Sequence, residues 1–386
     1  MDTLNIKHAI IGAGAMGAAA AYHLARRGEP LVLIDRFELA HARGSSHGAA
    51  RITRHSYADP RYARLMPSAF RAWRELEADA GTSLYLRTGG VSFSPPGVDY
   101  VAKVAASLEE LDVPSWRGSG RDFRVIHPAF AIPDRYDVVF EPDAGLLAAA
   151  RAVALQIAIA RRDGGDRTLV LDQTPVRAID LSGDRPVLET EAIRIVADRL
   201  IVAAGAWVGR LLPDWPVPVQ VTRQQVLYFR PADPGPFQVG RFPVFIYKGA
   251  DEDDAFYGMP DFLDLGVKAA RHAGPEVDPD VQSPTVDESY RSIVREFLRG
   301  HIPALADAAI GTTEVCLYTM APNDDFVIDF LPTRPDVIVA SPCSGHGFKF
   351  SCLIGRILAD LATLGTTDLP IDHWKCRAPA TPTDPA

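Results

Sequence analysis

The sequence predicts an α/β (α+β) fold in which a Rossmann-type nucleotide-binding domain, built from discontinuous segments, carries an inserted antiparallel-sheet domain. Three observations predict it. A strand, a glycine-rich turn, a helix and a second strand follow one another within residues 8–35. Further patterns typical of buried strands return at 199–203 and 336–340. Between them, at about 218–315, short alternating runs indicate half-exposed antiparallel strands.

The glycine-rich turn comes first along the chain. Residues 8–11 (HAII) have the pattern of a short buried strand, and residues 12–17 read GAGAMG. Gly12 permits the tight turn, Gly14 lets a pyrophosphate approach the N–H groups at a helix N-terminus, and Gly17 lets helix and strand pack closely. This arrangement predicts a dinucleotide site.

The helix and strand that follow support the same prediction. An alanine-rich helix is expected through about Arg27, and residues 31–34 form a second strand that ends at Asp35. Asp35 follows Gly12 by 23 positions, a spacing suited to accepting hydrogen bonds from the adenosine ribose. We therefore expect the cofactor site to include Ala15, Met16, Asp35 and Arg36.

The later strand patterns bear on which dinucleotide is bound. Residues 199–207 (RLIVAAGAW) and 336–340 (DVIVA) have buried-strand patterns, and the second leads into the turn 344–347 (SGHG) and then a helix. A nucleotide domain assembled from three distant segments suggests one large cofactor that spans it, which favours FAD over NAD. The cofactor site is also expected to include Val176, Gly205 and Trp207.

The inserted domain begins near Pro218. Its alternating runs and one helical pattern, at 288–298, predict an antiparallel sheet with a helix on it, and one face of this sheet would roof the flavin. The runs lie at 219–229, 244–247, 255–258 and 265–268. The predicted division of the chain is 1–90, 140–217 and 317–386 for the FAD-binding domain, and 91–139 and 218–316 for the substrate domain.

Composition and charge argue against several partners. The chain has 386 residues and a net charge of -9, which disfavours nucleic acid or an anionic membrane as a partner of the whole surface. The apolar stretch 144–160 is interrupted by Arg151 and is too short for a membrane span, so it predicts a buried or amphipathic helix. The first residues lack a basic start followed by an apolar run, which predicts a cytoplasmic location. No metal site is predicted, because the cysteines lie far apart, at Cys316, Cys343, Cys352 and Cys376.

Several motifs together resemble a known family. In chain order they are GAGAMG at 12–17, GSSHGAARITRH at 44–55, YG at 257–258, Lys268 with His272, VCLYT at 315–319 and SGHGFKFS at 344–351. From Ile10 to about Leu364 the chain resembles the family of monomeric sarcosine oxidase and N-methyltryptophan oxidase, which are flavin-dependent oxidases of N-methyl and other secondary amino acids. The combination is far more specific than any one of its motifs.

The resemblance gives the loop 44–55 a role that its composition alone does not. A glycine- and serine-rich loop with two arginines is by itself typical of a solvated surface. The resemblance implies that Arg51 lies against the flavin ring. This sequence differs from the family at Ala49 and Ala50, where the family has an acidic residue and a threonine. It also implies that three residues lie near the FAD phosphates, namely Gly44, Ser45 and Ser46.

Arg54 and Lys349 are, by the resemblance, the two cations that hold a substrate carboxylate. A guanidinium can hold a carboxylate by two parallel hydrogen bonds. On pattern alone Lys349 would be a solvated residue at a helix start, but a lysine buried beside a flavin is costly unless it has a partner. The resemblance also implies that backbone donors face the flavin pyrimidine from Gly345, His346 and Gly347.

The remaining site residues come from the inserted domain and its border. Cys316, taken alone, would be a small buried hydrophobe. The resemblance makes it the point of covalent attachment of FAD through a thioether, with Tyr318 lining the same pocket. Lys268 would be a surface strand residue on pattern alone, but the resemblance implies that it lies over the flavin and stabilises superoxide as oxygen reacts. Tyr257 and His272 resemble the family's substrate-pocket pair.

These observations predict an FAD-dependent oxidase of a secondary (N-methyl) amino acid, which transfers hydride to flavin, yields an imine and forms hydrogen peroxide from O2. The expected partners are a small-molecule amino acid and O2, and a monomer is expected. Three alternatives stay open: oxidation of a ring carbon in a cyclic imino acid such as proline or pipecolate, a flavin dehydrogenase that does not use O2, and a non-catalytic flavin-binding sensor. The full set of site residues argues against the sensor.

Overall fold

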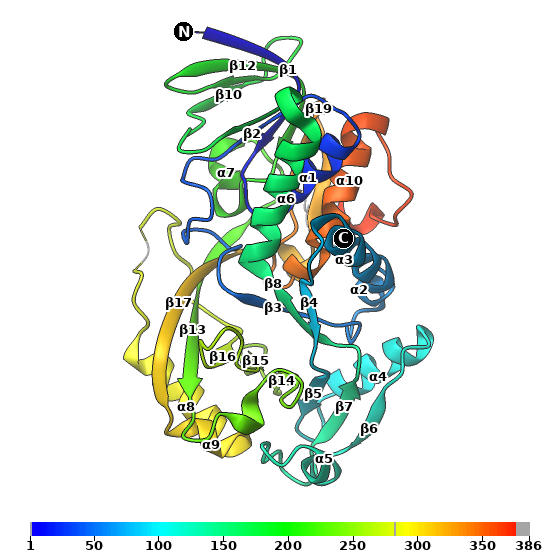
Figure 1. Ribbon diagram of the computed structural model, residues 1–386, viewed down its shortest axis with the longest axis vertical. Coiled ribbons are helices and arrows are strands. Elements are labelled where there is room, and N and C mark those ends of the chain that lie inside the picture. Colours follow the sequence, from blue (N-terminus) through cyan, green and yellow to red (C-terminus); the bar gives the residue numbers. More distant parts are fainter. Residues whose placement is uncertain (1, 282, 376–386) are drawn as a thin grey trace, which may run out of the picture.

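The structure of the protein is a computed structural model that describes residues 2–281 and 283–375. Two eight-stranded sheets form its two ends, and a small three-stranded sheet lies between them (Figure 1). The prediction of an α/β fold with a second, largely antiparallel sheet is therefore confirmed. The Pro/Thr-rich tail after Arg377 lies outside the described residues.

The first sheet has a parallel core in the order β19-β12-β1-β2-β9. Strand β1 is longer than the predicted 8–11, because its first half pairs with β12, from Asp2 opposite Ile193 to Ile6 opposite Ala197. The strands are β1 (Asp2–Ile11), β2 (Leu31–Ile34), β9 (Thr168–Leu171), β10 (Ala178–Asp180), β11 (Val187–Glu189), β12 (Ile193–Val202), β18 (Val327–Leu331) and β19 (Arg334–Ser341).

Helices α1 (Ala15–Arg26), α6 (Ala149–Gly164) and α10 (Ser351–Leu364) pack together on this sheet, with α3 (Met66–Ala80) against α6 and α10. Alanine has the highest helix propensity, and its side chain is a single methyl group. The alanine run of α1 therefore forms a helix that α6 and α10 can approach closely. At Gly355 a Cβ would lie 2.4 Å from the Cβ of Ala19, which explains the glycine there. The predicted helix at 144–160 begins later, because Gly145–Ala148 form strand β8.

The second sheet has the order β17-β13-β16-β15-β14-β5-β7-β6. Its strands are β5 (Gly90–Ser94), β6 (Trp116–Ser119), β7 (Asp137–Glu141), β13 (Gln220–Arg230), β14 (Val244–Lys248), β15 (Ala255–Met259), β16 (Val267–Arg271) and β17 (Ala309–Met320). The three-stranded sheet consists of β3 (Ala50–Thr53), β8 and β4 (Tyr85–Arg87). The shorter or peripheral helices are α2 (Pro60–Ala63), α4 (Tyr100–Glu110), α5 (Gly120–Ile126), α7 (Val208–Leu211), α8 (Glu288–His301) and α9 (Pro303–Ala306).

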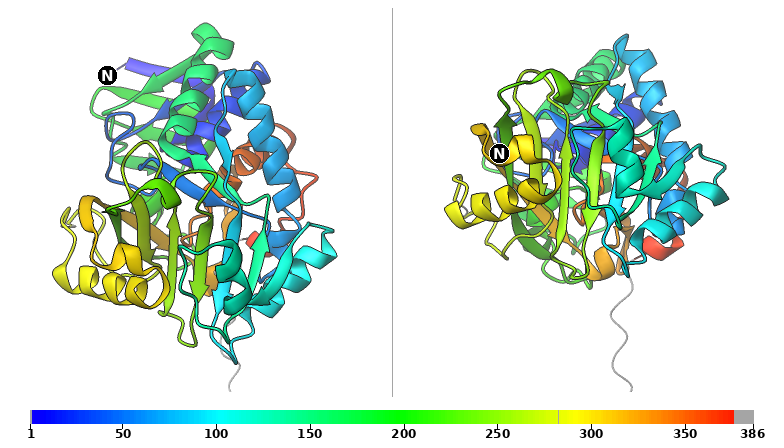
Figure 2. Two further views of the ribbon diagram at one scale, coloured as in Figure 1. Left: turned by 60° about the horizontal axis from the view of Figure 1, so that its bottom comes forward. Right: turned by 90° about the horizontal axis from the view of Figure 1, so that it is seen from below.

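Helices α8 and α9 cover the outer face of the second sheet, turned away from the first sheet (Figure 2). Alternate strand residues such as Leu227 and Phe245 pack there against Phe297 of α8. The other face of the sheet looks toward the glycine-rich turn. The helices therefore cover the outer face of the sheet, and its inner face, which looks toward the glycine-rich turn, is available for a site.

Strand β13 is more buried than its alternating pattern predicts. Residues 222–229 are all buried, so the expectation of a half-exposed strand is wrong. Its polar residues are covered on the α8 side: the Arg223 guanidinium pairs with Asp287 at 3.0 Å, and the Tyr290 hydroxyl donates to the Gln225 carbonyl at 2.5 Å. Polar partners on α8 and the preceding loop allow these residues to be buried.

The predicted division into domains stays a prediction. Strand β17 continues to Met320 and pairs with β13 along its length, so one strand crosses the proposed boundary between 316 and 317. Within residues 2–281 and 283–375, no helix has both the length and the apolar character that crossing a membrane requires.

Candidate active site

A cavity of about 660 Å³ is lined by both the glycine-rich turn and the inner face of the second sheet. This volume is within the usual range for a cofactor or ligand site. The structure brings together around it nearly all residues that the sequence predicts for the site: Gly12, Gly14, Ala15, Met16, Asp35, Arg36, Gly44, Ser45, Ser46, Arg51, Arg54, Val176, Gly205, Trp207, Tyr257, Lys268, His272, Cys316, Tyr318, Gly345, His346, Gly347 and Lys349.

Gly17 is the exception, and it does not line the cavity. A Cβ at Gly17 would lie 1.8 Å from the carbonyl oxygen of Gly12, so this glycine serves the close packing of α1 on β1. At Gly12, φ is +101° and a Cβ would lie 2.3 Å from the Ala203 carbonyl oxygen. Only glycine fits both positions.

The N-terminus of α1 opens onto the cavity, as an anion site requires. The Ala15 N–H donates to the Ser46 hydroxyl at 2.9 Å, which ties the loop after Gly44 to the helix. Asp35 follows β2, and its carboxylate accepts the N–H groups of Ala13 at 2.7 Å and Phe37 at 2.9 Å. A carboxylate has about four acceptor sites, so Asp35 still has capacity for ribose hydroxyls.

At the nucleotide end of the cavity, Asp280 connects segments that are far apart in the sequence. Sequence reasoning did not predict this residue. Asp280, in the loop before α8, accepts the indole N–H of Trp207 at 2.8 Å and a guanidinium N–H of Arg36 at 3.1 Å, and it also pairs with Arg210. The sequence around Asp280 contains no motif that marks it. The loop thus lies across residues predicted to line the cofactor site.

Arg51, on β3, is held by carbonyl groups of the residues just before it in the sequence. Its guanidinium donates to the carbonyl oxygens of Ser45 at 2.9 Å, His47 at 2.6 Å and Ala50 at 2.9 Å. Three carbonyl acceptors fix the orientation of the planar guanidinium. The loop is therefore ordered around its arginine, unlike the solvated loop that its composition alone suggests.

The pleat of the second sheet places the other predicted residues on one face. In strands, residues two apart share a face, and directly paired residues share it too. Lys268 pairs with Met259, Ala270 pairs with Tyr257, and Cys316 pairs with Gln224. These alternating positions, together with His272 and Tyr318, form the inner face that roofs the cavity.

Lys268 is only 3% exposed, so the interpretation of its pattern as a surface strand residue is wrong. It is buried because its strand is covered on both faces. Burial and the charge of Arg51 lower the pKa of Lys268 to about 8, against the opposing effect of Glu314. Glu314, which the sequence analysis did not predict, lines the same cavity and accepts a hydrogen bond of 3.0 Å from Tyr228.

Arg54 and Lys349 meet at Tyr57, another residue that sequence reasoning missed. The Arg54 guanidinium lies over the Tyr57 ring at 4.6 Å from its centroid, and the Lys349 ammonium donates to the Tyr57 hydroxyl at 2.9 Å. Among the described residues, the buried Nη1 of Arg54 has no hydrogen-bond partner. Burial and the charge of Arg54 hold the pKa of Lys349 well below its usual value. The two cations thus lack a nearby anion at this point of the cavity.

A directed chain of hydrogen bonds leads from Lys349 to the loop 321–326. Burial and the charge of Lys349 hold the pKa of His346 well below its usual value, so its ring is neutral. Its Nε2 lies 3.0 Å from the Asp324 carbonyl oxygen and must donate, so its Nδ1 accepts from the Tyr57 hydroxyl at 3.0 Å. The Tyr57 oxygen in turn accepts from Lys349. Each hydrogen bond of this chain therefore has one defined donor and one defined acceptor.

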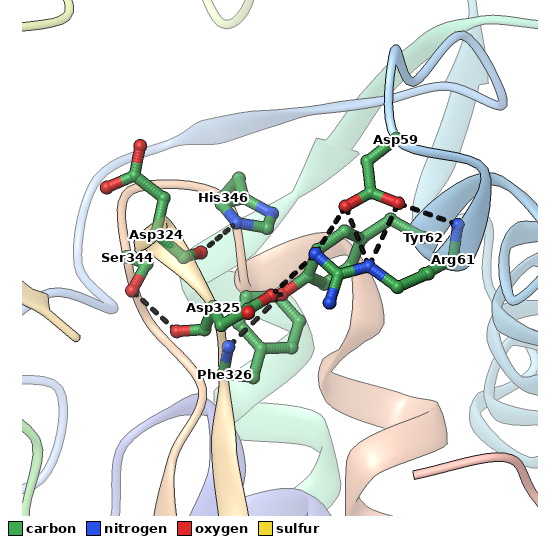
Figure 3. Close-up of polar contacts among 8 residues, drawn as sticks. All are labelled: Asp59, Arg61, Tyr62, Asp324, Asp325, Phe326, Ser344 and His346. Atoms are coloured by element: carbon green, nitrogen blue, oxygen red, sulfur yellow. Dashed lines mark hydrogen bonds and ion pairs between the residues drawn. The ribbon is translucent and has the colours of Figure 1, made fainter. Parts of the chain in front are cut away.

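Figure 3 shows how this loop is anchored to α2. The Tyr62 hydroxyl donates to the Asp325 carboxylate at 2.9 Å and accepts the buried N–H of Phe326 at 3.1 Å. The Ser344 hydroxyl donates to the Asp325 carbonyl at 2.8 Å, and Arg61 pairs with the Asp325 carboxylate at 3.2 Å. The loop therefore holds the acceptor for His346 in place.

Tyr257, His272 and Tyr318 form the wall facing the two cations. Burial and the charges of Lys248, Lys349 and Arg54 lower the pKa of His272 to about 3, and burial raises the pKa of Tyr257 to about 12. The Tyr318 hydroxyl lies 3.5 Å from Nδ1 of His272. Near neutral pH these groups are uncharged hydrogen-bonding partners.

Cys316 is a buried free thiol on the cavity side of β17. Burial raises its pKa, while the neighbouring charges of Arg51 and Lys268 oppose that rise. Burial outweighs the two cations, so the protonated thiol, rather than the nucleophilic thiolate, is the prevailing form near neutral pH. In the described part of the chain, no group of His, Cys, Asp or Glu residues is arranged to hold a metal ion.

The residues of the cavity fit a flavin dinucleotide. The glycine cradle and the α1 N-terminus suit a pyrophosphate, and Asp35 suits a ribose. The buried atoms Nδ1 of His47 and Nη1 of Arg54 have no partner among the described residues, although both side chains line the cavity. Polar atoms that are buried without partners indicate a bound group.

Sequence relatives match almost the whole chain. Monomeric sarcosine oxidase of Bacillus sp. (strain NS-129) is 33% identical over 96% of this chain and 96% of its own length. N-methyl-L-tryptophan oxidase of Salmonella agona is 31% identical over 93% of this chain and 94% of its own length. Human peroxisomal sarcosine oxidase is 32% identical over 92% of this chain and 91% of its own length.

Solved structures share the fold. NikD, described as an unusual amino acid oxidase essential for nikkomycin biosynthesis, has a TM-score of 0.84 at 21% identity, covering 97% of this chain and 98% of its own. L-proline dehydrogenase from P. horikoshii has a TM-score of 0.84 at 20% identity, covering 97% of each chain. The family described as FAD dependent oxidoreductase matches residues 7–361. The chain therefore belongs to the family of FAD-dependent oxidoreductases that includes the sarcosine and N-methyltryptophan oxidases.

Proposed function

We propose that this enzyme oxidises a secondary amino acid, with sarcosine or another N-methyl amino acid preferred to a cyclic imino acid, and uses O2 as its electron acceptor. One observation carries the choice of substrate: Arg54 and Lys349 converge on Tyr57 without an anion beside them. The carboxylate of an amino acid would neutralise this pair, and Arg54 can hold it with two hydrogen bonds. The named relatives act on substrates of this class.

The wall opposite the cations would receive the amine. His272 is neutral and Tyr257 is protonated at neutral pH, so both can bind an uncharged amine without stabilising its ammonium form. FAD, when bound, accepts the two electrons as a hydride and supplies the redox chemistry. The C–H bond beside nitrogen breaks, a C=N bond forms, and water hydrolyses the imine. Two electrons and two protons convert O2 to hydrogen peroxide.

Two further roles belong to the same proposal. The Cys316 sulfur would hold FAD through a thioether, supported by its place on the cavity wall beside Arg51 and Lys268. Lys268 would provide a fixed cation for the superoxide that forms as the first electron reaches oxygen. A monomeric state and a cytoplasmic location remain predictions from the sequence.

An oxygen-uptake screen with peroxide detection tests the proposal. Sarcosine, N-methyl aromatic amino acids, proline, pipecolate and the corresponding decarboxylated amines are compared with the purified holoenzyme. Turnover of the carboxylated N-methyl compounds and little turnover of the decarboxylated amines is expected. Equal turnover of the decarboxylated amines refutes the carboxylate clamp. Exclusive turnover of the cyclic acids favours the imino acid alternative, and flavin reduction without oxygen uptake favours a dehydrogenase.

A further inference from the structure

The substrate end of the cavity, which we define by Arg54, Tyr257, His272 and Lys349, has a third cation at Lys248. Lys248 is the last residue of β14, and no motif of the sequence marks it. Two cations are sufficient for one carboxylate. A third cation at the same end of the cavity needs a different explanation.

The strand register places Lys248 on the inner face. Ile246 pairs with Tyr257, which lines the cavity, and Lys248 lies two residues further along the same strand. Lys248 pairs with Ala255, whose carbonyl accepts the backbone N–H of His272 at 2.7 Å. Lys248 and His272 therefore flank one strand on the face that roofs the cavity.

The charge of Lys248 acts on the substrate end. Besides burial, it is the largest influence that lowers the pKa of His272, ahead of Lys349 and Arg54. Within the described residues the Lys248 ammonium has no ion pair within 4.0 Å. The two acidic residues that line the cavity, Asp35 and Glu314, lie at the nucleotide end and beside Tyr228. Outside the cavity wall, the charge of Lys248 reaches the Asp324 carboxylate and opposes the rise in its pKa that burial causes, but the two groups form no ion pair within 4.0 Å. Lys248 is thus a half-exposed cation at the substrate end, and the carboxylate it acts on does not line the cavity.

We infer that the substrate carries a second anionic group on its side chain, and that Lys248 binds it while Arg54 and Lys349 bind the α-carboxylate. This inference rests on the proposed function and makes it more specific: the preferred substrates are N-alkyl derivatives of acidic amino acids. The long, flexible stem of a lysine lets its ammonium reach side chains of different length. An uncharged side chain of the same shape leaves the third cation without an anion inside the cavity.

The test compares substrates that differ in side-chain charge alone. Each enantiomer of N-methylaspartate and N-methylglutamate is measured against its side-chain amide, N-methylasparagine or N-methylglutamine. For the unmodified holoenzyme, kcat/KM is expected to favour the acid by roughly tenfold or more, since a partly buried charge pair is stronger than one in bulk water. Lys248→Met should bring the ratio close to one, and Lys248→Glu should favour the amide.

A binding measurement separates this inference from the proposed function. Methoxysuccinic and methoxyacetic acids, in which an ether oxygen replaces the amine, are titrated into the holoenzyme by calorimetry. Tighter binding of methoxysuccinate, lost in Lys248→Met and kept in the control Lys103→Met, supports the inference even where turnover fails. Lys103 lies on α4 and does not line the cavity.

Two results overturn the inference. One is an acid-to-amide ratio near one in the unmodified enzyme, with equal binding of the two ethers. The other is a preference for the acid that persists in Lys248→Met. Turnover of sarcosine with either result leaves the proposed function standing, whereas absence of turnover for every secondary amino acid, with the methoxy acids still bound, contradicts the proposed function alone.

Discussion

The Lys349 ammonium donates a hydrogen bond to the Tyr57 hydroxyl, although the two residues lie 292 positions apart in the sequence. The same tyrosine ring supports the Arg54 guanidinium on its face. Tyr57 therefore sets the spacing between the two cations that are proposed to hold the substrate carboxylate. It touches no reacting atom, and its expected role is to position Lys349 and the His346 ring.

Tyr57→Phe keeps the ring under Arg54, and it removes one acceptor of Lys349 and the donor to Nδ1 of His346. A hydrogen bond to a charged group contributes about 1.5–3 kcal/mol, so KM for the secondary amino acid should rise roughly tenfold or more while kcat changes little. Steady-state kinetics measure the split. In a Lys349→Met background the same change should add little. An equal additional loss there would show that Tyr57 acts independently of Lys349.

Cys316→Ala should release FAD from the protein on acid denaturation, because the proposed thioether is absent. Absorbance of the supernatant after acid precipitation measures the released flavin. The matched control is Cys343→Ala, which also removes a cavity-lining cysteine and should keep the flavin attached. Flavin wholly in the supernatant from the unmodified enzyme would contradict covalent attachment. Circular dichroism should show that both variants keep the fold.

Lys268→Met should slow reoxidation of the reduced enzyme by more than roughly tenfold, a loss of about 1.4 kcal/mol of transition-state stabilisation. The Lys268 pKa of about 8 means that the ammonium is present below that pH and is lost as pH rises through it. The oxygen reaction of the unmodified enzyme should therefore slow across pH 8, whereas that of the variant should be slow and independent of pH. Rapid mixing with oxygen measures both, and anaerobic reduction by substrate is the control. An unchanged oxygen rate removes Lys268 from the mechanism.

Tyr62→Phe should lower the free energy of unfolding by about 1–3 kcal/mol, because the buried N–H of Phe326 loses its acceptor and the Asp325 carboxylate keeps only its bond to Arg61. Denaturant unfolding of the holoenzyme measures this change. Arg61→Gln is the control, since the Arg61 side chain is 43% exposed and exposed pairs contribute under about 1 kcal/mol. Equal losses in the two variants would show that the buried bonds of Tyr62 are not the stronger anchor.

Local sequence signals predicted the nucleotide-binding half of the fold well. The glycine-rich turn and Asp35 follow from steric and hydrogen-bonding requirements that only a few residue types meet. The burial of β13 could not be predicted in this way. Its alternation is the same whether one face meets solvent or a helix, and the partners of Arg223 and Gln225 come from residues about 60 positions away.

In the candidate site, too, residues with a local sequence signal could be predicted, and residues without one could not. Residues within compact motifs, such as Arg51 and Cys316, could be predicted because the resemblance rests on those motifs. Tyr57 and Asp280 could not, because a lone tyrosine or aspartate in a loop has no local pattern and acts only through distant partners. Pattern alone also misjudged Lys268, since the strand sequence does not show that both faces of the sheet are covered.

The pairing of Lys248 with Ala255 has a consequence for mutational change. Because neighbouring strand residues point to opposite sides, deleting one residue near the start of β14 would move Lys248 into the place of Tyr247 and Tyr247 into the place of Ile246. The charge would then enter the aromatic core beside Phe297, and the ring would face the cavity. Point substitutions at alternate positions leave that core untouched. Single substitutions at cavity-facing positions of β14, β15 and β16 can therefore change the substrate preference without disturbing the core. Insertions and deletions in these strands are expected to prevent folding.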